Sequence, residues 1–171
     1  MNRLVLMPFA RRADGIIVGI DDLSTSERGA ACRCTCLSCG LPVIARMGQH
    51  NKSCFAHDYH AKADSERCTY SPETVIRIVM MDVLPKLGKL PMRDGSFSAI
   101  KSIHIEDHAD YDAWALIGGL SHPVYIEIPP PGRLIAKVAS GITFHPGKIL
   151  SSINGSESSR SSIVAAMLQD D

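Results

Sequence analysis

Two closely spaced pairs of metal-ligand residues constrain this chain more than any other feature. In the stretch CLSCGLPVIARMGQHNKSCFAH, Cys36 and Cys39 form a Cys-x-x-Cys pair, and Cys54 and His57 form a Cys-x-x-His pair, with fourteen residues between the two pairs. Zn²⁺ prefers four tetrahedral nitrogen or sulfur ligands, and the two pairs supply that number. The spacing therefore predicts a structural zinc site formed by these four residues.

Other residues nearby are alternatives to one of these ligands. Cys32 and Cys34 precede Cys36 in ACRCTC, and this period of two indicates strand residues rather than ligands. His60 and Cys68 lie in the polar stretch DYHAKADSERCTYS, which is typical of a solvated linker. The competing interpretation is reduced core cysteines with a chance histidine. A disulfide framework is less favoured, because the N-terminus does not resemble a signal peptide, and we expect a cytoplasmic protein.

Composition limits the classes of partner. A chain of 171 residues with 45% apolar residues suits one medium domain, or a small zinc module and a compact core. The 18 Lys and Arg residues balance the 18 Asp and Glu residues, so any contact with DNA would be local. No apolar run reaches the roughly 18 residues needed to cross a bilayer, so we expect no membrane partner.

Local patterns predict an α+β fold. Two apolar runs flanking Asp14-Gly15 predict a hairpin over residues 4–20. Ser71-Pro72 is typical of a helix start, and the run ETVIRIVMMDVL predicts a buried helix that ends at Pro85. The remaining expected elements are strands at 97–106, 113–118 and 124–128 and a short helix at 133–140.

We divide the chain into three parts. Residues 1–70 form the expected N-terminal hairpin and zinc-binding module, and residues 71–150 form an α/β core. Residues 151–171 include SSINGSESSRSS, a composition typical of a flexible linker, and predict a Ser-rich flexible tail.

The order of these features resembles the competence protein CoiA-like family of bacterial predicted nucleases. The matching residues are ERGAACRCTCLSCGLPVIARMGQ, CFAH at 54–57, the loop from Ala63-Asp64 to Cys68, and SPET at 71–74. The resemblance covers roughly residues 10–130. It implies a small zinc-binding β-hairpin/knuckle module followed by a reduced restriction-endonuclease-like α/β core of the PD-(D/E)xK type.

The resemblance also implies catalytic residues. Glu73 matches a glutamate of the family's helix, and Asp112 and Glu127 match the two acids of the core. Such carboxylates would hold Mg²⁺, which polarises the phosphate and activates a water molecule. The third position of the core motif is Pro129, which can neither donate nor coordinate, and Lys137 on the following segment would replace it.

Departures from the family pattern predict an altered or lost active site. Arg77 and Met81 stand where the family's helix has histidine and lysine. We expect a zinc-binding protein that acts on or binds DNA, and an active form would be a Mg-dependent DNA endonuclease or exonuclease. The alternative is a non-catalytic, nuclease-derived protein that binds a protein partner, such as a mobile-element inhibitor of a nucleic-acid machine. The residues expected to contact DNA are basic: Arg28, Arg33, Arg46 and Lys52.

Overall fold

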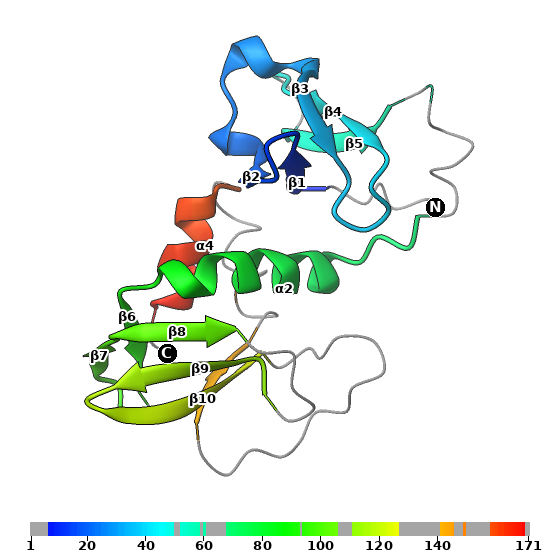
Figure 1. Ribbon diagram of the computed structural model, residues 1–171. Helices are drawn as coiled ribbons and strands as arrows, with labels where there is room; N and C mark the ends of the chain where they lie inside the picture. Colours follow the sequence, from blue (N-terminus) through cyan, green and yellow to red (C-terminus); the bar gives the residue numbers. More distant parts are fainter. Residues whose placement is uncertain are drawn as a thin grey trace.

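The fold is α+β, as the sequence predicts. The computed structural model describes residues 7–49, 52–58, 60, 68–92, 94–105, 111–126, 141–145, 149 and 158–169. Within these ranges the chain forms three β-sheets and two α-helices. Helix α2 (Pro72–Val83) runs between a five-stranded sheet and a four-stranded sheet (Figure 1). No helix in the described ranges is long and apolar enough to cross a membrane.

The first sheet, called here the N-terminal sheet, has the strand order β2-β1-β3-β4-β5 with antiparallel neighbours. Its strands are β1 (Phe9–Arg12), β2 (Ile17–Gly19), β3 (Gly29–Thr35), β4 (Pro42–Arg46) and β5 (Cys54–His57). Two short 3-10 helices, η1 (Ile20–Asp22) and η2 (Thr25–Glu27), connect β2 to β3.

Local chemistry explains the first hairpin. Gly15 has a φ of +86°, which glycine adopts at low cost, and the Asp14 carboxylate accepts a hydrogen bond from the Ile16 amide at 3.0 Å. The hairpin predicted over residues 4–20 is therefore confirmed for its described part. Alternation along β1 sends Phe9 to one face of the sheet and Ala10 to the other.

Helix α2 begins as the sequence predicts. Ser71 is the N-cap, and its hydroxyl accepts a hydrogen bond from the Thr74 amide at 3.4 Å. Proline at the first helical position lacks the N–H that would be unpaired there. The helix ends at Val83, and Pro85 lies in the following 3-10 helix η4 (Leu84–Lys86). The buried residues of α2 are Val75, Ile76, Val79, Met80 and Val83.

The four-stranded sheet has the order β11-β10-β9-β8, with β10 and β11 parallel and the other pairs antiparallel. Gly118 and Gly119 turn β9 into β10, and both have positive φ. The stretch 97–106 is predicted as one strand, but its described part, residues 97–105, forms two strands in different sheets, because β7 pairs with β6 and β8 pairs with β9. The strands are β6 (Lys89–Pro91), β7 (Phe97–Ala99), β8 (Ser102–Ile105), β9 (Ala113–Ile117), β10 (Leu120–Ile126) and β11 (Ile142–Phe144).

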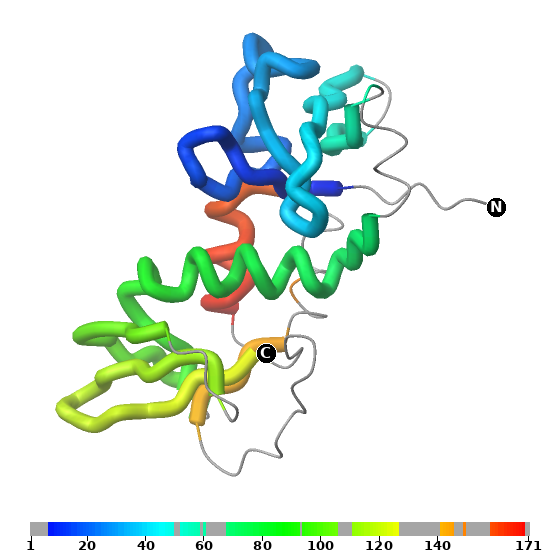
Figure 2. Tube along the Cα trace, turned by 45° about the vertical axis from the view of Figure 1, so that its right-hand side comes forward, coloured from blue at the N-terminus to red at the C-terminus, as the bar shows by residue number. Residues whose placement is uncertain are grey.

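The described part of the Ser-rich C-terminal segment is packed against the protein. Helix α4 (Arg160–Met167) starts next to the N-terminal sheet and then crosses α2, against which it packs (Figures 1 and 2). Ile163 and Met167 have 0% and 2% of their surface exposed, and both belong to the same buried cluster as α2. Residues 158–169 thus differ from the expected flexible tail, because an apolar face of α4 completes the core. The helix predicted at 133–140 lies outside the described residues.

Candidate metal centre

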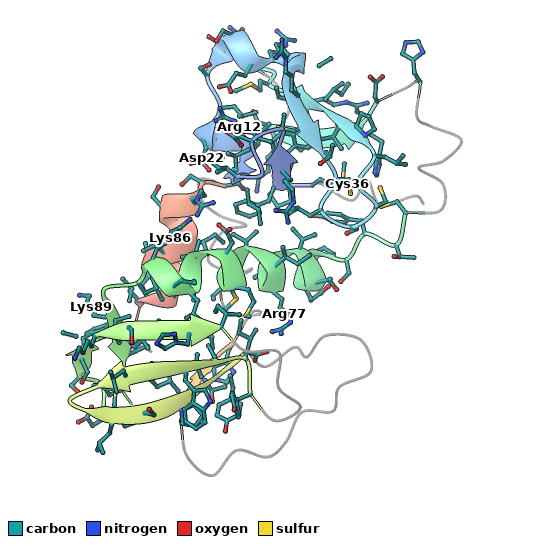
Figure 3. All side chains as sticks on the ribbon, viewed as in Figure 1. Arg12, Asp22, Cys36, Arg77, Lys86 and Lys89 are labelled. Carbon is teal, nitrogen blue, oxygen red and sulfur yellow. The ribbon has the colours of Figure 1, made fainter. Side chains whose placement is uncertain are left out.

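Four side chains that can bind a metal gather at one end of the N-terminal sheet. They are Cys36, Cys39, His57 and Cys68, and their ligand atoms all lie within 4.8 Å of one another. Three of them belong to the predicted zinc site. Cys68, which the sequence leaves as an alternative, stands where Cys54 was expected. Figure 3 shows Cys36 on the side of the sheet toward the start of α2.

The distances within this Cys₃His group fit one tetrahedral ion. The Sγ atoms of Cys36 and Cys68 are 3.8 Å apart, and Cys39 Sγ lies 3.3 Å from His57 Nε2. Zinc bonds of about 2.3 Å to sulfur and about 2.0–2.1 Å to nitrogen place two sulfurs about 3.8 Å apart and a sulfur and a nitrogen about 3.5 Å apart. The group could therefore hold a metal such as zinc without rearrangement of the backbone.

A tight turn positions the first two ligands. Cys36 follows β3, and the Gly40 amide donates to the Cys36 carbonyl at 2.9 Å. Gly40 has a φ of +73°, a conformation that favours glycine. The Ser38 amide donates to Cys36 Sγ at 3.4 Å. A thiolate, the form of cysteine that binds metal, can accept this hydrogen bond.

His57 reaches the group from β5. It lies opposite Val43 of β4, so the β4–β5 hairpin returns the chain to the turn that carries Cys36 and Cys39. Burial lowers the pKa of His57 below its ordinary value of 6.5. The neutral imidazole is therefore favoured near pH 7, and it is the form that binds metal.

Cys68 comes from the segment just before α2. Burial first, and then hydrogen bonding to Cys39 and repulsion from Cys36, raise the pKa of Cys68 to about 12. Three sulfur atoms this close together cannot all be thiolates unless a cation lies between them, and metal binding in such groups releases the protons. The sequence signal for this ligand was weak, because Cys68 has no partner at a two-residue spacing.

Strand alternation explains why Cys54 is not in the group. Cys54 and His57 are both on β5, three residues apart, so their side chains point to opposite faces of the sheet. A Cys-x-x-His pair binds one ion only where the chain turns between its members. Cys54 instead lies opposite Arg46 of β4, and burial raises its pKa.

The two cysteines of β3 are strand residues, as predicted, and both are buried. Cys32 and Cys34 are 4% and 2% exposed and pack in the cluster of the N-terminal sheet. Their thiols donate to the carbonyls of Val43 at 3.5 Å and Cys32 at 3.2 Å, respectively. Burial, and then the neighbouring Cys32, raise the pKa of Cys34 to about 12, so it stays a thiol. His60 is exposed and is not a member of the Cys₃His group.

The predicted catalytic residues are differently placed. Glu73 is exposed in the first turn of α2, where hydrogen bonding from the Ser71 hydroxyl lowers its pKa. Asp112 is 1% exposed, and its two carboxylate oxygens accept hydrogen bonds from Arg77 at 2.5 Å and from the Ile126 amide at 2.7 Å. Figure 3 shows Arg77 on the side of α2 toward the four-stranded sheet.

Two further catalytic candidates, Glu127 and Lys137, lie outside the described residues. The structure thus brings Asp112 next to Arg77, one helical turn after Glu73. In the sequence, Arg77 stands out only as a departure from the family pattern. Comparisons of the chain with protein-family models, with curated proteins and with solved structures found no match.

Proposed function

We propose that this protein is a zinc-stabilised, nuclease-like protein whose core has lost metal-dependent cleavage and which acts by binding DNA. The observation that carries this proposal is the buried ion pair between Arg77 and Asp112. In a restriction-endonuclease-like core, which the resemblance implies here, an aspartate at this place would help to hold Mg²⁺.

A guanidinium next to Asp112 disfavours a metal at that carboxylate. Arg77 Nη2 lies 2.5 Å from Asp112 Oδ1, and the two side chains are 11% and 1% exposed. In a site with so little water, a second positive charge beside an arginine is strongly repelled. Arg77 already neutralises Asp112, so the carboxylate needs no cation. The ion pair therefore supports a structural use of the residue expected to be catalytic.

The proposed role of zinc is also structural. Three cysteines and one histidine fill the four positions of a tetrahedral ion, whereas catalytic zinc sites keep one position for water or substrate. The ligands would join the turn after β3, the strand β5 and the segment before α2. Such a site needs reduced cysteines, and this supports the cytoplasm as the location.

The register of the N-terminal sheet supports a local DNA-binding surface. Gly29 lies opposite Ala45, and Arg46 lies opposite Cys54, so Arg28 and Arg46 are at the same end of neighbouring strands. Lys52 precedes β5 at this end, and all three residues lie at the opposite end of the strands from the Cys₃His group. Arg33 is exposed on β3. A few basic side chains suffice for binding to phosphates that depends on salt.

One experiment tests both parts of the proposal. Zinc-loaded protein is incubated with labelled single- and double-stranded DNA, with Mg²⁺ or Mn²⁺, and binding is measured over a range of salt concentrations. We expect binding without cleavage. Arg46→Gln should weaken binding and reduce the salt slope by about one, because one phosphate contact is lost. Arg11→Gln, which removes the same charge from the other end of the sheet, is the matched control.

Two outcomes would contradict the proposal. Cleavage that needs the divalent ion and disappears in Glu127→Ala would show that the active site works despite the Arg77–Asp112 ion pair. Absence of DNA binding by protein that contains its zinc would favour the alternative, a non-catalytic protein that binds a protein partner.

A further inference from the structure

We infer that metal binding and docking of the C-terminal helix are coupled through α2, because the metal group and Arg160 connect the two ends of this helix to the N-terminal sheet. The inference rests on the proposed occupation of the Cys₃His group by zinc. It goes further in assigning to the metal an effect on α4, which contributes no ligand to the group.

The N-terminal sheet and the rest of the protein have separate hydrophobic clusters. The first cluster lies within the sheet and includes the buried cysteines, and the second includes α2, α4 and the four-stranded sheet. Phe9 and Ile17 are the buried residues of the N-terminal sheet that belong to the second cluster. Tyr70, just before α2, packs against both clusters. Apolar contact between the two parts is therefore limited, so the polar links at the two ends of α2 become important for holding the parts together.

The metal group connects the sheet to the first end of α2. Three of its members, Cys36, Cys39 and His57, belong to the N-terminal sheet and its turn, whereas Cys68 lies three residues before the N-cap Ser71. An ion bound by all four side chains would hold the start of α2 at the sheet. Cys68 is the one ligand of the group that makes this connection.

Arg160 connects the sheet to the other end of α2. Its guanidinium lies 2.7 Å from Asp82 of α2 and donates to the Ile17 carbonyl of β2 at 2.7 Å. Its backbone amide donates to the Asp22 carboxylate of η1 at 2.9 Å. One residue of α4 thus contacts α2, β2 and η1. Figure 3 shows Asp22 and Lys86 at this end and Cys36 at the other.

The neighbouring serine strengthens the second connection. The Ser158 amide donates to the Asp21 carboxylate at 2.6 Å, and the Asp21 amide donates to the Ser158 carbonyl at 3.2 Å. A helix rises 1.5 Å per residue, so Ser71 and Asp82 are about 16 Å apart along α2. Forming either connection limits the motion of a stiff helix and so raises the effective concentration of the groups that form the other. By reciprocity, each connection must then strengthen the other.

Hydrogen exchange on the full-length protein, with and without one equivalent of zinc, tests the coupling. We expect zinc to slow exchange of the amides of Ile163 and Leu168 by about fivefold or more, the low end of usual coupling. The decisive comparison is Cys68→Ser with Cys39→Ser, because each variant loses one sulfur ligand. Only Cys68→Ser loses the connection to α2, so zinc should protect α4 in Cys39→Ser and leave it unchanged in Cys68→Ser.

Zinc content, measured in the same samples, separates failure of this inference from failure of the proposed site. Wild-type protein that binds no zinc through these residues would contradict the proposed site. Zinc that is bound but protects only residues 31–58 would overturn the coupling alone.

A second pair of variants tests the coupling if Cys68→Ser binds no zinc. Arg160→Met should then weaken zinc affinity about fivefold, because it removes the connection at the other end of α2. Lys86→Met is its control, because Lys86 also contacts Asp82 but lies within the same helical segment. Equal zinc affinity in these two variants would overturn the coupling.

Discussion

At the scale of single residues, Arg77 decides what Asp112 can do. A carboxylate with 1% exposure is costly unless its charge is compensated, and here a guanidinium compensates it. The Ile126 amide donates a hydrogen bond to the second carboxylate oxygen of Asp112, so this side chain also joins the loop before β9 to the end of β10. Asp112 therefore stabilises the four-stranded sheet where the resemblance implied a metal ligand.

Removing one partner of this pair should be strongly destabilising. Arg77→Met would leave the Asp112 charge buried and unpaired, so we expect the free energy of unfolding to fall by about 3–5 kcal/mol. The double variant Arg77→Met/Asp112→Asn should be less destabilised than the sum of the single variants, because asparagine is neutral and still accepts from the Ile126 amide. Urea denaturation measures both effects.

The control for the ion pair is Lys86→Met. Lys86 lies 3.8 Å from Asp82, but its side chain is 66% exposed, so its loss should cost less than about 1 kcal/mol. Equal stability of Arg77→Met and Lys86→Met would show that the Arg77–Asp112 pair is not buried in solution.

At the scale of elements, α4 depends on a glycine far away in the sequence. A Cβ atom added to Gly19, at the end of β2, would lie 1.9 Å from the Ser158 carbonyl oxygen. The φ of Gly19 is −79°, so the backbone itself would accept alanine. Gly19 is thus required for the close approach of two segments of the backbone, the end of β2 and the segment just before α4.

Gly19→Ala should displace the C-terminal segment. We expect a loss of about 1–3 kcal/mol in stability, typical of overpacking, and faster hydrogen exchange of α4 amides. Gly48→Ala is the matched control, because its Cβ atom would meet nothing within 4 Å. If the two variants show the same exchange in α4, residues 158–169 are not docked at β2.

At the scale of the whole molecule, the members of the Cys₃His group come from two parts of the protein that share few apolar contacts. Because the ligands come from β5, from the turn after β3 and from the segment before α2, metal binding would contribute directly to the folding free energy. Stability should therefore depend on the metal and on any condition that removes it.

Acid should remove the stabilisation by zinc. The thiols must lose protons to bind the metal, and unfolded His57 binds a proton at its ordinary pKa of 6.5, above its folded value. The unfolded state then binds more protons, so stability falls as pH falls, and the contribution of His57 to this loss begins near 6.5. We expect the difference in Tm between zinc-loaded and chelator-treated protein to shrink from pH 7.5 to pH 5.5. A difference independent of pH would contradict ligation by thiolates and a neutral histidine.

The sequence by itself determined the local features. The Asp14-Gly15 turn, the Ser71 cap and the period of Cys32 and Cys34 depend on neighbouring residues, so they could be predicted. Cys36, Cys39 and His57 could be identified as members of a metal group because two pairs at a two-residue spacing are a strong signal.

Only the tertiary structure decided which distant residues meet. The strand conformation of β5 turns Cys54 away from His57, and the start of α2 brings Cys68 to the group instead. The pairs Arg77–Asp112 and Arg160–Asp82 join residues 35 and 78 positions apart. Spacing along a chain fixes neighbours within one turn or strand, whereas these contacts depend on how whole elements pack, and no local pattern records that packing.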